Sequence, residues 1–190
     1  MPRTLTSITP RQAPQILDGF DLHDVWAVDL DNATTTFPAL RELIRSQQGP
    51  PPALAVRALF GLRALLGKIF RLDDHDGGGS ENPHLGRLPS ELRESSTIPS
   101  GTLDGPFTLL YATNDEAVYH IVNSTVDAML LIALEPNQSG QRLLWATYLK
   151  PVGTITRLYM ALIDPFRRFV VYPGLESWLK RTVAASPDIG

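Results

Sequence analysis

The sequence predicts an α+β domain in which a curled antiparallel sheet wraps around a long C-terminal helix. Three observations lead to this prediction. Short apolar runs separated by turn residues fill positions 107–150, a helical repeat of apolar residues follows from about Gly153, and one strand with two helices precedes both. Because a single twisted sheet can bury its apolar face only against another layer, the C-terminal helix is expected to cover it.

The N-terminal third contains one predicted strand and two predicted helices. Residues 24–30 have the aromatic and β-branched content of a strand, and 34–46 follow as a helix with Thr35 or Thr36 near its N-cap. Residues 53–72 have helical periodicity, with an apolar face opposite a cationic one. This second helix either packs on the sheet or lies on a membrane surface, and we favour packing with the cations reaching into water.

Residues 73–105 are predicted to form a long flexible loop within the domain. They contain three consecutive glycines, several prolines and many small polar residues. Such a loop is either a lid over a pocket or a tolerated insertion. The Asp-Asp-His-Asp run at 73–76 has the composition of a metal site. Consecutive residues in a Gly-rich loop do not converge on one ion without a scaffold, so we favour a solvated loop.

Four further strands are predicted at 107–112, 116–122, 125–134 and 142–150, and their short connections indicate an antiparallel meander. Side-chain alternation assigns one face of these strands to the interior. The interior residues expected are Phe107, Leu109, Tyr111, Ala117, Tyr119, Ile121, Val126, Ala128, Leu130, Ile132, Leu134, Leu143, Trp145, Thr147 and Leu149. His120 falls on the opposite face, as an exposed or hydrogen-bonded structural residue. A one-residue slip would instead bring His120 and Tyr148 inside as an acid/base pair.

The C-terminal helix is expected to kink or restart at Asp164–Pro165, because proline lacks the amide hydrogen that a helix needs. The Tyr-Pro-Gly sequence at 172–174 predicts a second break. The apolar face expected comprises Ile155, Leu158, Tyr159, Leu162, Phe166, Phe169 and Val170. On the other face we expect an ion pair between Asp164 and Arg168, and a solvated ion-paired surface rather than a site for an anion. With charges at its centre, 158–175 is not a membrane anchor.

Length and composition favour one domain over residues 1–190. The net charge is −3 and charged residues make up 19% of the chain, which gives no indication of nucleic-acid binding. There is no cysteine, which excludes disulfides, thiol nucleophiles and thiolate metal sites. No run of eighteen apolar residues predicts a transmembrane segment, and no apolar core near Met1 predicts a signal peptide. We therefore expect a cytoplasmic protein.

Residues 148–175 resemble the C-terminal part of a bacterial domain family of unknown function that often follows a short-chain-dehydrogenase-like NAD-binding domain. The matching positions are Pro151, Gly153, Arg157, Tyr159, Pro165, Phe166, Arg168, Pro173 and Gly174. Lys150 and Arg167 stand where that family's pattern has histidines. The family is similar to the START and polyketide-cyclase superfamily. The resemblance therefore implies a helix-grip fold with an apolar cavity between the sheet and the long helix.

The resemblance also implies that the domain binds a hydrophobic small molecule. It acts either as a polyketide-cyclase-type enzyme of secondary metabolism, which cyclises or isomerises a templated substrate with hydroxyl assistance, or as a non-catalytic carrier or sensor of a lipid-like ligand. The candidate catalytic residues are Tyr111, Tyr119 and Tyr159. The candidate ligand-binding residues are Trp26, Leu130, Trp145, Thr147, Leu162 and Phe166. Each aromatic residue among them has the alternative of being a core residue with its polar end satisfied.

No cofactor is expected. The chain has no metal-binding motif, and no Gly-x-Gly-x-x-Gly sequence follows a predicted strand. The three glycines at 77–79 lack the preceding strand and following helix that a phosphate-binding loop requires, so dinucleotide binding is not expected.

Overall fold

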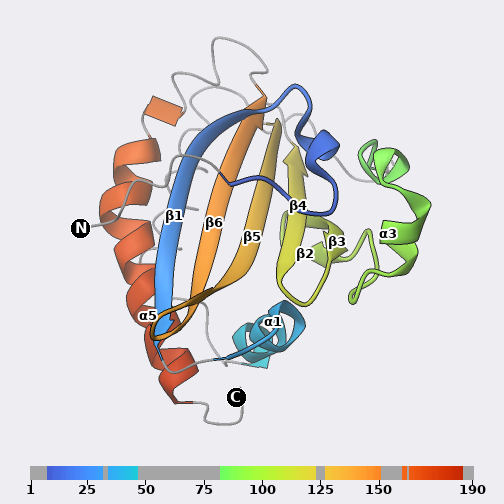
Figure 1. The fold of residues 1–190 in the computed structure, drawn as a ribbon. Coiled ribbons are helices and arrows are strands. Elements are labelled where there is room, and N and C mark those ends of the chain that lie inside the picture. Colours follow the sequence, from blue (N-terminus) through green and yellow to red (C-terminus); the bar gives the residue numbers. More distant parts are fainter. Residues whose placement is uncertain are drawn as a thin grey trace.

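Six strands form one antiparallel sheet in the computed structural model of the chain, which describes residues 8–31, 34–46, 82–122, 127–150, 160–161 and 163–185 (Figure 1). The order across the sheet is β1-β6-β5-β4-β3-β2. The strands are β1 (Asp21–Asp31), β2 (Leu103–Asp104), β3 (Phe107–Ala112), β4 (Glu116–Val122), β5 (Asp127–Asn137) and β6 (Gly140–Lys150). The predicted meander is confirmed as β3 to β6, and β1 returns to pair with β6.

The helical elements are short apart from the C-terminal one. They are η1 (Pro14–Leu17), α1 (Phe37–Ser46), η2 (Leu85–Arg87), α3 (Ser90–Glu94), the π-helical η3 (Arg167–Val171) and α5 (Tyr172–Ala184). The helix predicted at 34–46 is confirmed as α1, and the Oγ1 atom of Thr36 accepts a hydrogen bond from the Ala39 amide at 3.4 Å, as expected near an N-cap. Among the described residues, no helix combines the length and apolar character needed to cross a bilayer.

Four predicted segments fall partly or wholly outside the described residues, including the strand predicted at 125–134, whose first two residues lie outside them. The helix predicted at 53–72 lies outside them, as do 73–81 of the predicted loop and 153–159 of the predicted C-terminal helix. From Asn82 onward the predicted loop contains η2, α3 and β2. Leu88, Leu92 and Ile98 within it are buried, because each finds apolar partners on the sheet.

One face of the sheet is covered by α1 and α5, and we call it the helix-covered face. Figure 1 shows α5 running alongside β1, with α1 close to the end of the sheet near the C-terminus. Phe37 and Leu40 of α1 and Leu179 and Val183 of α5 join one buried cluster with strand residues. Those strand residues are Trp26, Val28, Leu30, Leu109, Ala112, Ala117, Tyr119, Leu130, Leu134 and Leu143. This layer is therefore the main apolar core.

The other face is covered by the N-terminal segment and the residues around η2 and α3, and we call it the loop-covered face. Its buried cluster comprises Ala13, Ile16, Leu17, Phe20, Leu88, Leu92, Leu110, Tyr111, Val118, Met129, Leu131, Ala146 and Tyr148. A buried carboxylate fastens the N-terminal segment to it. Glu116 accepts hydrogen bonds from the amides of Arg11 at 2.9 Å and Gln12 at 3.1 Å, and from the Tyr111 hydroxyl at 2.7 Å. Both faces of the sheet are thus buried.

The predicted interior face agrees with the helix-covered face at Tyr119, Leu130 and Leu143, but it is wrong at Tyr111. Leu109 pairs with Tyr119, while Tyr111 pairs with Val118, so Leu110 is an extra residue in β3. Such a β-bulge turns the following side chains to the opposite face. Tyr111 therefore lies on the loop-covered face, which strict alternation could not show.

The break predicted at 172–174 is wrong, because the helix continues from Ile163 through η3 into α5. Pro173 is the second residue of α5, which directly follows the π turn of η3, where the regular helical hydrogen-bond ladder is already interrupted. The wider π turn of η3 changes which side chains face the sheet. Phe169, predicted on the apolar face, is 79% exposed. Asp164, predicted to pair with Arg168, instead pairs with Arg167 at 3.4 Å.

Replacing Glu116 should weaken the whole fold, because its carboxylate is the acceptor for two backbone amides and a buried hydroxyl. We expect Glu116→Ala to lower the free energy of unfolding by about 2–4 kcal/mol. Glu135→Ala is the matched control, since Glu135 makes an ion pair with Arg11 at a more exposed position and should cost less than about 1 kcal/mol. Urea unfolding of both variants measures this, and equal losses would contradict the anchoring role of Glu116.

Candidate functional site

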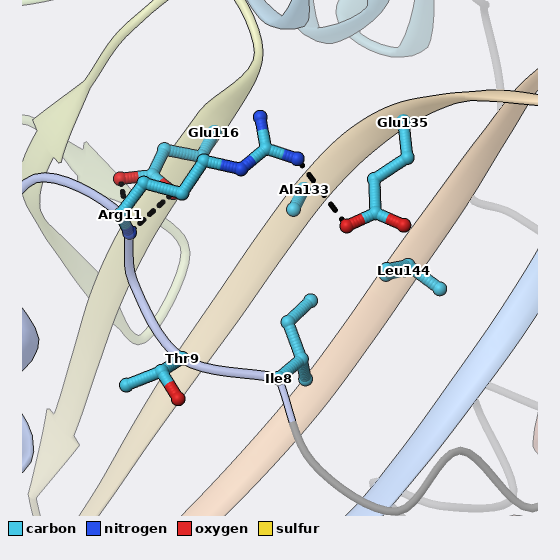
Figure 2. Close-up of a pocket in the computed structure, with 7 residues that line it drawn as sticks. All are labelled: Ile8, Thr9, Arg11, Glu116, Ala133, Glu135 and Leu144. Atoms are coloured by element: carbon cyan, nitrogen blue, oxygen red, sulfur yellow. Dashed lines mark hydrogen bonds and ion pairs between the residues drawn. The ribbon is translucent and has the colours of Figure 1, made fainter.

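A cleft of about 270 Å³ on the loop-covered face runs along the N-terminal segment (Figure 2). It is lined by Ile8, Thr9, Arg11, Glu116, Ala133, Glu135 and Leu144. Its charged groups are already engaged: the Arg11 guanidinium pairs with Asp115 and Glu135, and Glu116 binds backbone amides. This cleft therefore lies along the contact between the N-terminal segment and the sheet, and we do not place a ligand there.

A second group of polar residues lies on the helix-covered face, where β1 meets the C-terminal helix. A β-bulge in β1 places two of them. Leu22 pairs with Tyr148 and Asp24 pairs with Thr147, so His23 is an extra residue. As a result, the side chains of both His23 and Asp24 bond to residues of the C-terminal helix. β-bulges often re-aim side chains in this way beside functional sites.

The guanidinium of Arg167 is the centre of this group. It bonds to Asp24 at 3.1 Å, to the Oγ1 atom of Thr147 at 3.1 Å and to Asp164 at 3.4 Å, and it also donates to the Tyr172 hydroxyl. The Tyr172 hydroxyl in turn donates to Asp24 at 2.5 Å. The Arg167 side chain is only 14% exposed, so the solvated surface predicted here is wrong at Arg167. We call Asp24, Thr147, Asp164, Arg167 and Tyr172 the Arg167 network.

An aromatic wall lies directly beside the network. The Trp26 ring stacks on Tyr172, with centroids 5.2 Å apart and planes 12° apart, and it meets Trp145 edge to face at 6.4 Å. Three of the predicted ligand-binding residues, Trp26, Trp145 and Thr147, therefore gather here. Leu130 lies in the same core layer and Phe166 is half-buried. Tyr159 and Leu162 lie outside the described residues.

His23 and Asp164 form a dyad at the more accessible end of the network. The Nε2 atom of His23 lies 2.9 Å from the Asp164 carboxylate, and both side chains are 22% exposed. A carboxylate that holds an imidazole in this way fixes its orientation for proton transfer. Burial raises the pKa of Tyr172 and outweighs the opposite effect of the Arg167 charge. The Tyr172 hydroxyl consequently stays protonated at neutral pH and acts as a hydrogen-bond donor.

The structure places two of the three predicted catalytic tyrosines, Tyr111 and Tyr119, on opposite faces of the sheet. Tyr119 donates to Asp104 at 2.9 Å, and Asp104 also makes a bidentate pair with Arg41 at 2.7 and 2.8 Å. Tyr111 donates to Glu116 on the opposite face. Burial, as the largest cause, raises the pKa of both hydroxyls.

Sequence reasoning missed His23, Asp24 and Tyr172. One signal was present in the Asp-Leu-His-Asp sequence at 21–24. Polar residues at the successive positions 23 and 24 break the alternation of a strand, as a β-bulge does. Tyr172 was missed because the break predicted at 172–174 placed it at a helix end, where its side chain was not expected to face the sheet.

A third polar group lies on the loop-covered face and includes His84 and His120. His120 was expected on the face away from the predicted interior, either exposed or hydrogen-bonded. In the structure His120 is buried, and it is hydrogen-bonded to Asn82 at 2.9 Å and to Asp127 at 2.8 Å. Burial lowers the pKa of His84 to about 4, with the nearby His120 as a smaller cause. His84 is therefore a neutral imidazole at neutral pH.

Comparison with known proteins gives one family. A family model described as "Protein of unknown function (DUF2867)" matches residues 16–174, a range that begins in η1, includes all six strands and ends in α5. Neither the curated proteins nor the solved structures contain a match to this chain. The matched range contains every residue of the Arg167 network.

Proposed function

This chain belongs to the DUF2867 family, and we propose that it binds a hydrophobic small molecule between its sheet and its C-terminal helix. We further propose that it acts on this molecule as a cofactor-independent enzyme of the polyketide-cyclase type, by cyclisation or isomerisation. The observation that carries the proposal is the Arg167 network, a set of charged and polar groups beside the aromatic wall of Trp26 and Trp145. Ligand sites combine apolar walls with a few convergent polar groups in this way.

The energetics of buried charge support a role in binding. A buried ion pair is often no more stabilising than apolar side chains of the same volume, because both charges lose their hydration. Stability alone therefore gives little reason to put Arg167 and Asp24 into an apolar layer. An oriented guanidinium at the end of an aromatic wall is useful for holding a carbonyl or hydroxyl oxygen of a ligand.

The architecture supports a helix-grip interpretation. A curled antiparallel sheet carries a long C-terminal helix across one face, and the Arg167 network lies between them. In a fold of this kind the ligand lies between the sheet and that helix, which is where Trp26, Trp145 and Thr147 gather. The similarity to the START and polyketide-cyclase superfamily is part of the proposal.

In the proposed reaction, the substrate is a flexible chain with a carbonyl group. Its carbonyl oxygen accepts a hydrogen bond from the Arg167 guanidinium, which stabilises the negative charge that develops there. His23, oriented by Asp164, removes a proton from the adjacent carbon and returns it to the product. Trp26 and Trp145 hold the apolar chain in a folded conformation, which supplies the orientation that cyclisation needs.

A non-catalytic carrier or sensor of a lipid-like ligand is the second candidate. One specific observation favours it, namely that the tyrosine hydroxyls are already engaged inside the protein. Tyr111 donates to Glu116, Tyr119 to Asp104 and Tyr172 to Asp24. A ligand held by the apolar wall alone needs none of these hydroxyls.

Tryptophan fluorescence should report binding directly, because Trp26, Trp145 and Trp178 all lie in the layer between the sheet and α5. We expect dansyl-labelled undecanoic acid to quench this emission with saturation at one molecule per chain. Arg167→Met should weaken the binding by roughly five- to tenfold through the loss of a charged hydrogen bond. Arg168→Met is the matched control, because Arg168 is exposed. Quenching that does not saturate, or equal effects of the two variants, would contradict the site.

Proton exchange separates the enzyme from the carrier. A hydrophobic β-diketone in D₂O loses the signal of its acidic C–H in proton NMR when a base removes that proton. We expect the protein to accelerate this exchange, and His23→Ala to return it to the buffer rate while the quenching by dansyl-labelled undecanoic acid persists. Exchange at the buffer rate in the unmodified protein, together with saturable quenching, would reject the enzyme and leave the carrier.

A further inference from the structure

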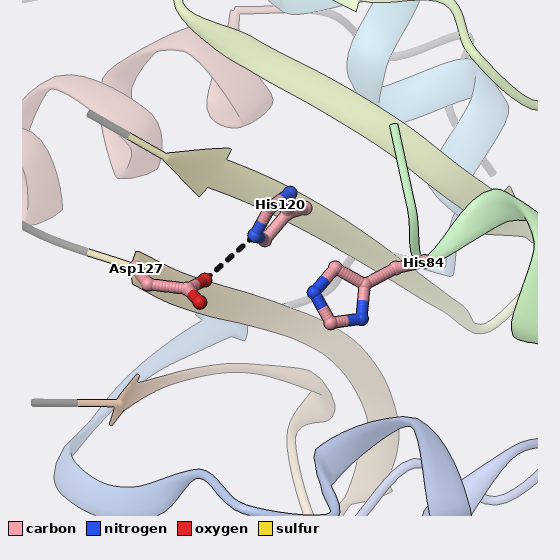
Figure 3. A group of neighbouring side chains, drawn as sticks. All are labelled: His84, His120 and Asp127. Atoms are coloured by element: carbon pink, nitrogen blue, oxygen red, sulfur yellow. Dashed lines mark hydrogen bonds and ion pairs between the residues drawn. The ribbon is translucent and has the colours of Figure 1, made fainter. Parts of the chain in front are cut away.

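A compact group of nitrogen and oxygen ligands lies on the loop-covered face, opposite the face that holds the Arg167 network (Figure 3). It consists of His84, His120 and Asp127, each of which offers a ligand atom within 4.8 Å of the other two. Both histidines are almost completely buried, His84 at 5% and His120 at 2% exposure. The group is therefore built into the protein rather than displayed on its surface.

Three separate elements bring these side chains together. His120 of β4 pairs with Met129 of β5, and Asp127 precedes Met129 by two residues, so it is the diagonal neighbour of His120 on the same face. His84 lies at the start of η2. Its ring meets that of His120 edge to face, with centroids 4.5 Å apart. Figure 3 shows one ring nitrogen of His84 turned toward Asp127.

Asn82 holds the two histidines in place. Its Oδ1 atom accepts a hydrogen bond from the His84 amide at 3.0 Å, and its Nδ2 atom lies 2.9 Å from Nδ1 of His120. An amide that donates to Nδ1 leaves the imidazole proton on Nε2. That Nε2 atom lies 2.8 Å from the Asp127 carboxylate, to which it donates.

His84 has one ring nitrogen turned toward the group and the other turned away from it. The Nδ1 atom of His84 is buried and has no hydrogen-bond partner among the described residues. This atom lies on the side of the ring away from Asp127, so the Nε2 atom is the one that faces the group. The Asp127 carboxylate has one oxygen bonded to His120, and His84 presents its second ring nitrogen to the same space.

We propose that His84, His120 and Asp127 bind a divalent transition-metal cation, with Zn²⁺ as the representative ion. Two imidazoles and one carboxylate are a donor set that such cations accept, and the coordination sphere keeps at least one position for water or another ligand. Hard cations such as Mg²⁺ and Ca²⁺ prefer oxygen donors, so this set discriminates against them.

Binding requires one proton to move. The cation needs a free lone pair on Nε2 of His120, which carries a proton in the unbound protein. That proton transfers to Nδ1 of the same ring, so His120 changes tautomer and no proton is released. The Asn82 amide then rotates to present Oδ1 to that N–H and gives up its bond to the His84 amide. Asn82→Asp removes this conflict, because a carboxylate accepts from both N–H groups. A carboxylate behind a metal-bound histidine also raises its basicity.

Calorimetric titration of the full chain with ZnCl₂ tests the proposal. We expect a single Zn²⁺ per chain, an affinity lowered by more than roughly tenfold in His84→Ala and in Asp127→Asn, and an affinity raised by about tenfold in Asn82→Asp. His23→Ala is the matched control, since it removes a histidine from the other face and should leave Zn²⁺ binding unchanged. Asp127→Asn is nearly isosteric, so it keeps the test valid where His84→Ala does not fold.

Two results would overturn the proposal. One is the absence of Zn²⁺ binding by the unmodified chain, checked also by a thermal unfolding midpoint that does not rise with Zn²⁺. The other is binding that survives His84→Ala and Asp127→Asn but is lost in His75→Ala, which would place the ion at the Asp-Asp-His-Asp run of 73–76.

Discussion

The ion pair between Arg167 and Asp24 is the contact that orients the polar groups of the helix-covered face. It joins the C-terminal helix to the edge strand β1 at 3.1 Å, and both side chains are nearly buried, at 14% and 11% exposure. A charge in such a place is tolerated only when its remaining hydrogen bonds are satisfied. Thr147, Asp164 and Tyr172 supply them. Tyr172 is thereby fixed against Trp26, and the aromatic wall follows from the ion pair.

Two departures from regular structure make this ion pair possible. The β-bulge at His23 turns Asp24 toward the helix, and the π turn of η3 carries Arg167 inward while Phe169 is left exposed. The bulge interrupts the alternation of the strand and the π turn interrupts the α-helical repeat. The ion pair between Asp24 and Arg167 compensates for both. Bulges and π turns are frequent at functional sites for this reason. The same region is where the proposed ligand would meet polar groups.

Regular periodicity explains which parts of the fold were predictable. Apolar runs bounded by turn residues located β1 and β3 to β6, and alternation placed Tyr119, Leu130 and Leu143 in the main core. The predictions failed where one residue was added to a repeat. Leu110 turned Tyr111 to the other face, and the π turn displaced Phe169 and replaced the Asp164–Arg168 pair with Asp164–Arg167. Within the candidate site, Trp26, Trp145 and Thr147 were predicted, whereas His23, Asp24 and Tyr172 depend on those added residues.

The two faces of the sheet divide the polar chemistry of the domain between them. The helix-covered face holds a permanently charged guanidinium with its carboxylates beside tryptophan, which suits an organic ligand with an oxygen at one end. The loop-covered face holds two imidazoles and a carboxylate, which suit a cation. Because the two centres lie on opposite faces of one sheet, they are physically separate and can be altered independently.

A double-mutant cycle on Asp24 and Arg167 measures how strongly this ion pair couples the C-terminal helix to β1. The free energy of unfolding in urea is measured for the unmodified chain, for Asp24→Asn, for Arg167→Met and for the double variant. We expect strong coupling, in which the double variant loses about 1–3 kcal/mol less of its free energy of unfolding than the two single variants lose together. Additive losses within about 0.3 kcal/mol would contradict it, since the helix and strand would then be held together without this ion pair.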